Sequence, residues 1–364
     1  MERTFKYRVN EFWREFSNQE GEIRRLIDEQ TDLQMLVSRM KSLVDLAFND
    51  VNFEIGRKEK YELTLTPEGD RSKLFLIEYW RRCAPNELAS NWNFYSSKQA
   101  IGKGRDIELK IYGMDIGKDD YLICPKVDED RHKVDLEVFS PKLMNIDEDK
   151  RYSVVFISLD QYIGELYVME HIGKVDFVDD LSSDGITMGD LKERIDSLIE
   201  EMRWGRCEDP CQCFTSYKMK PNLTSRWDFR EDVLVGTTSC IQVLNDYYFN
   251  SSDHFDSAFE NGAIYGFIFY DNTTVPRNEV VTLRADIEDD LSVRLSNRTD
   301  ADVIGGATGL HYSYIDFIVY DMSSFMQTVD LVLSEYPVLS YGFSEFKRGG
   351  KVVRLKGTGS DILN

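Results

Sequence analysis

The order of hydrophobic periods after residue 262 limits the possible folds of this chain more than any other feature of its sequence. Strands are indicated where apolar and polar residues alternate, and helices where apolar residues recur every three or four positions. The expected elements, in chain order, are a strand at 263–270, a helix at 280–295, strands at 302–304 and 312–320, a helix at 325–333, and strands at 341–346 and 351–355. The strands at 263–270 and 312–320 are apolar at most positions, so we expect them side by side at the centre of one sheet.

This order is β-α-β-β-α-β with one additional strand, which is the ferredoxin-like plan. Each helical stripe has one apolar side, which predicts that both helices cover one face of the sheet. The run Gly305-Gly306-Ala307-Thr308-Gly309 lies between two of the strands. It does not match a phosphate-binding loop, because no helix follows it and no Lys-Ser/Thr pair is present. We therefore expect a hairpin turn or a bulge here, with a surface recognition loop as the alternative.

The first fifty residues are expected to be helical. Apolar residues between Phe5 and Phe16 lie on one face of a short helix, and Ser17-Asn18-Gln19-Glu20 has the form of a capping box that begins a second helix. A long amphipathic helix is predicted at 23–47. A coiled coil is the alternative for this stripe, which lasts about four heptads.

Between residues 51 and 205, helices and strands alternate without a regular βαβ rhythm. Expected strands lie at 51–55, 61–65, 92–96, 107–112, 121–124, 134–139, 153–159 and 175–178, and expected helices lie around 74–80, at 160–171 and at 191–202. This mixture predicts an α+β protein rather than a doubly wound sheet. The segment 205–230 is rich in Cys, Pro, Asn and Ser and has no apolar period. We therefore predict two domains: an N-terminal domain of mixed helix and antiparallel sheet at 1–205, and a C-terminal ferredoxin-like domain at 206–364.

The charge of the chain argues against two classes of partner. It contains 65 Asp and Glu against 44 Lys and Arg, a formal net charge of −21. Nucleic acids and anionic membranes are bound through basic surfaces, so we expect no nucleic acid and no membrane as partner. The acidic excess is dense at 115–200, where it is either a solvated face or a docking surface for a basic protein.

No export signal and no membrane span are expected. The residues after Met1 are charged rather than apolar, and the nearest candidate for an apolar run, 154–159, is six residues long. We therefore predict a cytoplasmic protein whose cysteines are reduced thiols. The six cysteines are Cys83, Cys124, Cys207, Cys211, Cys213 and Cys240. Three of them cluster at 207–213, but a zinc site needs a fourth ligand and nothing nearby in the sequence supplies one, so no bound metal is predicted.

No catalytic constellation stands out in the sequence. The four histidines, which are His132, His171, His254 and His311, stand alone, and neither HExxH nor GxSxG occurs. Asp160 and Glu165 flank an expected helix start, where the helix dipole favours acids, so neither is assigned a catalytic role. A dyad of Cys124, Cys240 or a serine with a distant histidine stays open. We predict no catalytic, cofactor-binding or metal-binding residue, and no cofactor.

Several aromatic and hydrophobic motifs in the first half resemble those of a bacterial family called domain of unknown function 695. The motifs are Phe12-Trp13 with Phe16, Val51-Asn52-Phe53-Glu54-Ile55-Gly56, the strand at 61–66, Trp92-Asn93-Phe94, Ser158-Leu159-Asp160 and Gly164-Glu165. The family has no established activity, so the resemblance implies no functional residue. The second half is similar, in the order of its elements only, to ferredoxin-like regulators such as the ribonuclease E inhibitor B family, and such a likeness carries little about function.

These observations favour a non-enzymatic cytoplasmic protein that binds another protein. An acidic inhibitor or immunity-type protein that masks a basic partner, such as a nuclease, fits the net charge. The alternatives are a hydrolase with a site between its domains and a protein that binds a small ligand in the same cleft. A pocket with convergent polar groups and perturbed ionisable residues would favour these alternatives, whereas a smooth acidic face would favour the protein-binding hypothesis.

Overall fold

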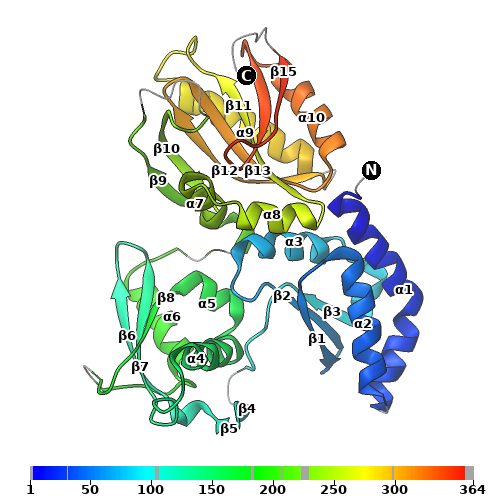
Figure 1. Cartoon of the computed structure of the whole chain (residues 1–364), viewed down its shortest axis with the longest axis vertical. Coiled ribbons are helices and arrows are strands. Elements are labelled where there is room, and N and C mark those ends of the chain that lie inside the picture. Colours follow the sequence, from blue (N-terminus) through cyan, green and yellow to red (C-terminus); the bar gives the residue numbers. More distant parts are fainter. Residues whose placement is uncertain are drawn as a thin grey trace.

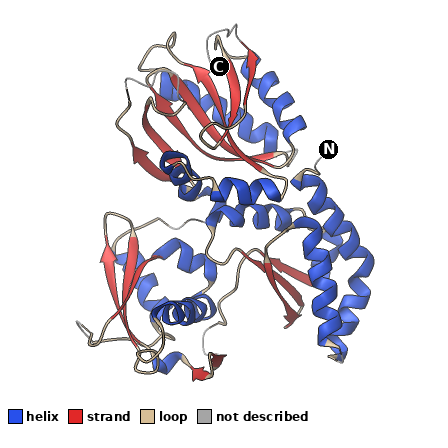
Figure 2. Ribbon diagram, viewed as in Figure 1, coloured by secondary structure: helices blue, strands red, loops and turns tan. Residues whose placement is uncertain are grey.

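The computed structural model describes residues 3–30, 32–102, 106–181, 184–205, 207, 209–222, 229–296 and 299–356. It confirms an α+β protein in which helices and four β-sheets are mixed along the described chain (Figure 1, Figure 2). The buried apolar side chains of these residues form three clusters, and the clusters show which parts of the chain share a core.

Two helices begin the chain, α1 (Phe5–Glu29) and α2 (Leu33–Ala47), and they lie side by side as a helical hairpin (Figure 1). The predicted capping box at 17–20 is wrong, because α1 continues through it: Phe12, Phe16 and Ile23 keep one buried stripe across that segment. The predicted long helix at 23–47 is also wrong. It breaks after Glu29, where Gln30 adopts a left-handed conformation with φ 49°, and Asp32 then caps α2 by accepting from the Met35 amide.

A small three-stranded sheet follows the helical hairpin. Strands β1 (Asn52–Arg57) and β2 (Tyr61–Thr66) form the predicted antiparallel hairpin, and β3 (Trp92–Tyr95) runs parallel to β2. Between β2 and β3 lie α3 (Arg71–Arg82) and the short 3₁₀ helix η1 (Asn86–Ser90). Helix α3 is buried along most of its length because it packs against this sheet on one side and against the C-terminal part of the chain on the other.

Residues 97–205, called the middle region below, contain a separate set of elements. These are β4 (Leu109–Ile111), β5 (Met114–Ile116), η2 (Lys118–Asp120), β6 (Leu122–Asp128), β7 (Lys133–Phe139), α4 (Glu148–Ile163), α5 (Glu165–His171), β8 (Ile172–Phe177) and α6 (Leu191–Glu201). Strands β6, β7 and β8 form one sheet, and β4 pairs with β5.

The predicted strand at 153–159 is wrong, because these residues lie inside α4. Val154, Val155 and Leu159 are buried at helical spacing, and a short apolar run of this kind cannot be told from a buried strand by its pattern alone. The predicted helix at 160–171 is correspondingly divided at Gly164, whose φ of 93° ends α4 and begins α5.

The C-terminal part of the chain forms a seven-stranded sheet in the order β15-β14-β11-β13-β12-β10-β9, with antiparallel pairing throughout. Its strands are β9 (Thr215–Lys218), β10 (Val233–Thr238), β11 (Ile264–Asp271), β12 (Ala301–Gly309), β13 (Tyr312–Val319), β14 (Tyr341–Glu345) and β15 (Val352–Lys356). Strands β11 and β13 pair with each other at the centre, which confirms that part of the prediction.

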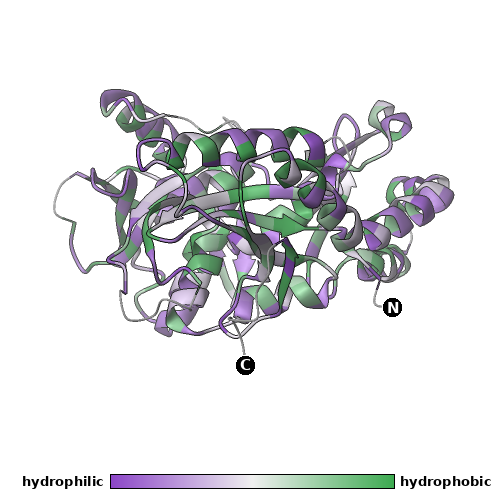
Figure 3. Ribbon diagram, turned by 90° about the horizontal axis from the view of Figure 1, so that it is seen from above, coloured by the Kyte–Doolittle hydropathy of each residue, from purple (hydrophilic) through white to green (hydrophobic). Residues whose placement is uncertain are grey.

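Helices cover both faces of this sheet. Helices α9 (Val280–Ser296) and α10 (Met322–Ser334) lie on one face, over the third cluster. The opposite face meets α7 (Ile241–Phe249), α8 (Asp253–Glu260) and α3, and it belongs to the first cluster. Seen from above, hydrophobic residues are frequent along the strands, while the ribbons of the flanking helices alternate between hydrophobic and hydrophilic residues (Figure 3).

The glycines at 305–309 lie inside β12 rather than in the turn that follows it, so of the two predicted alternatives, a hairpin turn or a bulge, the structure shows the bulge. The pairing of β12 with β13 shifts register between Val303 and Gly305. Gly305 has φ 153°, and a Cβ atom there would lie 2.2 Å from the Thr237 carbonyl oxygen of β10. The glycines therefore allow β10 to approach β12 closely.

The first cluster joins the two ends of the chain. Phe5 of α1 packs against Tyr79 of α3 and against Tyr320, which follows β13, with ring centroids 5.6 and 5.9 Å apart. The second cluster contains only residues of the middle region. The described residues within 3–96 and 209–356 therefore share a core, and they are called the main body below. The predicted boundary near residue 205 falls where the middle region ends, and folding as two units at 1–205 and 206–364 stays a prediction.

Candidate functional site

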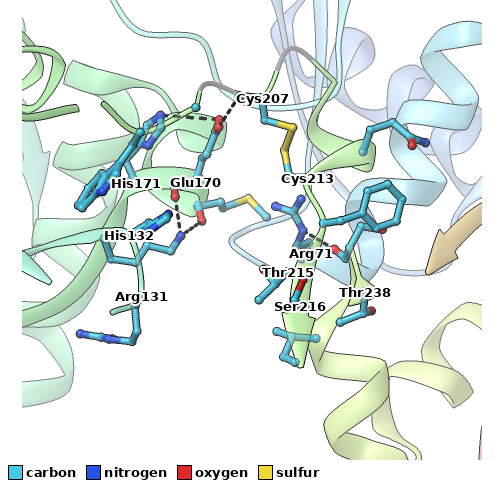
Figure 4. Close-up of a pocket in the computed structure, with 18 of the residues that line it drawn as sticks. Arg71, Arg131, His132, Glu170, His171, Cys207, Cys213, Thr215, Ser216 and Thr238 are labelled. Atoms are coloured by element: carbon cyan, nitrogen blue, oxygen red, sulfur yellow. Dashed lines mark hydrogen bonds and ion pairs between the residues drawn. A yellow bond between two sulfur atoms is a disulfide. The ribbon is translucent and has the colours of Figure 1, made fainter. Parts of the chain in front are cut away.

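A cavity of about 840 Å³ lies between the middle region and the main body (Figure 4). One wall consists of the start of β7 and the end of α5, with His132, Glu170 and His171. The opposite wall consists of the facing ends of β9 and β10 and the start of α7. Cys207 and Cys213 line the cavity as well (Figure 4).

Lys133, the first residue of β7, contributes a cation to this cavity. Its ammonium group donates to the carbonyl oxygens of Met169 and Glu170, at 2.9 and 2.5 Å, where α5 ends. Carbonyl groups at a helix C-terminus are natural partners for a cation. Burial and then the nearby positive charge of Arg71 lower the pKa of Lys133 to about 8, while the charge of Glu170 opposes this shift.

Arg71, the first residue of α3, contributes the second cation from the main body. Its guanidinium group donates to the carbonyl oxygens of Ser239 and Pro210 and so connects α3 to the loops before α7 and β9. In the part of the chain that the structure describes, neither Arg71 nor Lys133 forms an ion pair with a carboxylate. Arg131, at the rim of the same cavity, differs because it pairs with both Asp128 and Asp135.

Neutral donors complete the wall on the main-body side. Thr215 of β9 lies directly opposite Thr238 of β10, and both side chains line the cavity together with Ser216. Ile241 and Gln242, the first residues of α7, line it as well. The amide groups in the first turn of a helix have no partner within the helix and carry partial positive charge. This wall therefore offers hydroxyl and amide donors but no carboxylate from the residues described.

Two histidines occupy the middle-region side. The His132 ring stacks on Trp204, with ring centroids 5.3 Å apart. His171 packs edge-on against Tyr167, and its Nε2 lies 3.8 Å from a carboxylate oxygen of Glu170. These ring contacts hold both imidazole groups beside the cavity, although neither histidine belongs to a recognisable sequence motif.

Cys207 and Cys213 form a disulfide, which corrects the prediction that all six cysteines are reduced. The short 3₁₀ helix η3 (Pro210–Gln212) reverses the chain between them and brings their Cα atoms to 5.7 Å. Cys211 points elsewhere: it is buried in the first cluster, and burial raises its thiol pKa. Spacing alone could not have shown this, because the pairing depends on how η3 turns the chain.

Glu170 lies beside this pair. One of its carboxylate oxygens accepts from the Cys207 amide at 3.1 Å, and a carboxylate oxygen and both sulfur atoms lie within 4.8 Å of one another. The sequence offered no local ligand to join the cysteines, and 37 residues separate Glu170 from Cys207. Only the packing of α5 against the segment that follows α6 brings them together.

The other residues considered in the sequence have structural surroundings. Cys240 is fully buried, and burial raises its thiol pKa to about 12, so it is a poor nucleophile. Cys124 is also buried, and His254 pairs with Asp246 at 3.0 Å. Arg71 and Lys133, which shape the candidate site, were not singled out, because isolated basic residues carry no motif.

Asp160 and Glu165 lie where the middle region meets the main body. The buried Glu165 carboxylate accepts from the Thr66 hydroxyl at 2.9 Å and from the amides of Gly69 and Lys98 at 3.2 and 3.0 Å. Burial, together with the nearby negative charge of Glu165, raises the pKa of Asp160 to about 7. Glu165 therefore ties α5 to β2 and to the start of the middle region.

No family model matches the chain, and no curated protein and no solved structure matches it either. The resemblance of the first half to domain of unknown function 695 therefore stays a prediction. Among the described residues, no helix has the length and apolar character needed to cross a membrane.

Proposed function

We propose that the protein binds a small anionic ligand, bearing a carboxylate or phosphate group, in the cavity between the middle region and the main body. One observation carries this proposal: Arg71 and Lys133 face the same cavity, and their described hydrogen-bond partners are neutral backbone carbonyl groups. Although the chain has 21 more acidic than basic side chains, neither of these two cations forms an ion pair with a described carboxylate.

Electrostatics gives the physical reason. Arg71 and Lys133 repel each other, and this repulsion is part of the cause of the lowered pKa of Lys133. An anion between them would relieve the repulsion and accept charge-assisted hydrogen bonds from both groups. The hydroxyl groups of Thr215, Ser216 and Thr238 can satisfy its remaining acceptors. The cavity volume lies within the range of about 300–1,000 Å³ that small-molecule sites occupy.

This geometry favours the small-ligand alternative among the three functions considered from the sequence. A protein-binding role of the inhibitor or immunity type, a basic protein partner and a cytoplasmic location stay predictions based on composition. For the C-terminal sheet we propose the ferredoxin-like plan. The order β14-β11-β13-β12, with α9 and α10 on one face, supports it, and β15, β10 and β9 are then additions at the two edges.

Calorimetric titration with inorganic phosphate and with citrate tests the proposed ligand class. We expect at least one of the two anions to bind the wild-type chain and to raise its melting temperature. Lys133→Met and Arg71→Gln should each weaken that binding about tenfold or more, as expected for loss of a charge-assisted hydrogen bond.

Arg131→Gln is the matched control, because Arg131 lines the same cavity but already pairs with carboxylates; its effect should be under about threefold. Absence of binding of both anions to the wild-type chain would contradict the proposal. Binding that is equal in the wild-type, Lys133→Met and Arg71→Gln chains would place the anion elsewhere and would contradict it as well.

A further inference from the structure

We infer that Cys207, Cys213 and Glu170 form a zinc site when the disulfide between the two cysteines is reduced. The inference does not rest on the proposed anion function, because the positions of three ligand atoms carry it. Both sulfur atoms and a Glu170 carboxylate oxygen lie within 4.8 Å of one another. It reverses the sequence-based expectation of no bound metal, which rested on the lack of a further ligand near the cysteines.

The distances suit a tetrahedral ion. Zinc binds sulfur at about 2.3 Å and carboxylate oxygen at about 2.0–2.2 Å, which places ligand atoms about 3.3–3.8 Å apart. The sulfur atoms must separate from bonding distance to reach that spacing, and the Cα atoms of the two cysteines, 5.7 Å apart, leave room for this. Two thiolates with one carboxylate form a donor set that suits zinc better than magnesium or calcium.

The surroundings prepare these groups for an ion. The Cys207 amide donates to a Glu170 carboxylate oxygen at 3.1 Å, the kind of hydrogen bond that orients a carboxylate ligand, and the His171 Nε2 lies 3.8 Å from the other oxygen. Arg71 donates to the Pro210 carbonyl oxygen of η3, between the two cysteines, and it lines the same cavity as both of them. Its positive charge partly offsets the negative charge of two thiolates and one carboxylate.

The disulfide and the metal exclude each other, because a disulfide sulfur has no thiolate to bind the ion. A dithiol such as dithiothreitol supplies two electrons and two protons, which break the S–S bond and leave two thiols, while the dithiol becomes its own cyclic disulfide. Binding of Zn²⁺ then releases the two thiol protons to solvent. The three protein ligands leave one position of the tetrahedron for water or for an anion in the cavity.

The test compares Zn²⁺ binding to the fully reduced and the fully oxidised full-length chain, with a chromophoric chelator as competitor. We expect about one Zn²⁺ per reduced chain and none per oxidised chain. Cys207→Ser and Cys213→Ser should weaken binding on the order of 100-fold, and Glu170→Gln on the order of tenfold. Cys83→Ser is the control, because Cys83 is a free cysteine outside the three-residue cluster.

Alkylation of the wild-type chain provides a measurement that needs no variant. After reduction, Zn²⁺ should protect Cys207 and Cys213 from iodoacetamide and leave the labelling of Cys83 unchanged, as read by peptide mass spectrometry. Failure of the reduced wild-type chain to bind Zn²⁺ would mean that the two cysteines form only a disulfide, and it would overturn the inference. Binding that survives Cys213→Ser, or that Glu170→Gln does not weaken, would overturn it too.

Discussion

The middle region and the main body are held together by different kinds of interaction. The main body has a core that runs from Phe5 to Phe346, so residues from both ends of the chain exclude water together. The middle region has an apolar core of its own, and hydrogen bonds connect it to the main body: the Glu165 carboxylate accepts from the Thr66 hydroxyl and the Gly69 amide. Glu170 accepts from the amide of Cys207, which lies between the two regions in the sequence.

This difference explains where the cavity lies. Two surfaces that share a hydrophobic core pack without gaps, whereas surfaces that meet through a few hydrogen bonds leave space for solvent or a ligand. Arg71 approaches the cavity from the main body, and Lys133 approaches it from the middle region. A ligand that contacts both would therefore add a connection that the apolar cores do not provide.

The largest expected effect tests the core beneath α9. Ile287→Asp places a charge at a fully buried position between α9 and the sheet, and we expect it to lower the free energy of unfolding by about 5 kcal/mol. Asp289→Ala, on the exposed side of the same helix, should cost no more than about 0.5 kcal/mol. Thermal and urea melts of both variants measure this. Equal, small losses would show that α9 does not cover the sheet.

The next effect tests whether the N-terminal helices share their core with the C-terminal sheet. Phe5→Ala removes a fully buried ring that contacts Tyr79 and Tyr320, and should cost about 4 kcal/mol. Tyr7→Ala, at a 45% exposed position on α1, is the control and should cost about 0.5 kcal/mol or less. Hydrogen exchange should show lost protection in β11 and β13 but not in β7. Loss of protection confined to α1 and α2 would show that these helices do not share the core of the C-terminal sheet.

Much of the C-terminal sheet was predictable because its periods are long and regular. The strands β11 and β13 are buried over most of their length, and α10 carries a clean apolar stripe. The predictions failed where local patterns are ambiguous. The run at 153–159 is short and apolar, as a buried strand would be. It lies in helix α4 instead, whose buried residues continue to Ile163.

The candidate site was not predictable, because its residues come from four distant segments. Arg71, Lys133, Glu170 and Cys207 have no mutual spacing that a motif could describe. They meet only because the middle region docks beside the edge of the sheet formed by β9 and β10, and neither strand was among the elements expected from the sequence. Glu165 shows the same limit, since its partner Thr66 lies 99 residues away.

The third prediction tests the polar connection between the two regions. Glu165→Ala leaves the Thr66 hydroxyl and the Gly69 and Lys98 amides without their acceptor, and should cost about 3 kcal/mol. We expect faster cleavage by trypsin within 205–230, the predicted boundary segment, because the middle region is then held less firmly. Glu129→Ala, an exposed carboxylate in the middle region, is the control and should leave the cleavage rate unchanged. Unchanged cleavage in Glu165→Ala would contradict the anchoring role.

The smallest effect concerns pH and arises at the same junction. The pKa of Asp160 is raised to about 7, chiefly by burial and then by the negative charge of Glu165; Glu54 and Glu68 act in the same direction, and Lys98 opposes them. The folded chain therefore holds this proton more tightly than the unfolded chain, whose aspartate has its ordinary pKa. The contribution of protonated Asp160 to the stability of the fold is complete below the pKa of aspartate in the unfolded chain. This contribution is lost as the pH rises through about 7.

Asp160→Asn removes this pH-dependent loss of stability, because the amide group does not ionise. From about pH 5 to about pH 8 the free energy of unfolding of the wild-type chain should fall relative to that of the variant by about 2 kcal/mol, less than the full shift implies because the group is partly exposed. Asp179→Asn, an exposed residue of the same region, should follow the wild-type chain across this range. Urea melts at the two pH values measure the difference. A constant difference between wild type and Asp160→Asn would mean that Asp160 ionises as readily in the folded chain as in the unfolded one, and that the junction between the two regions is open to water.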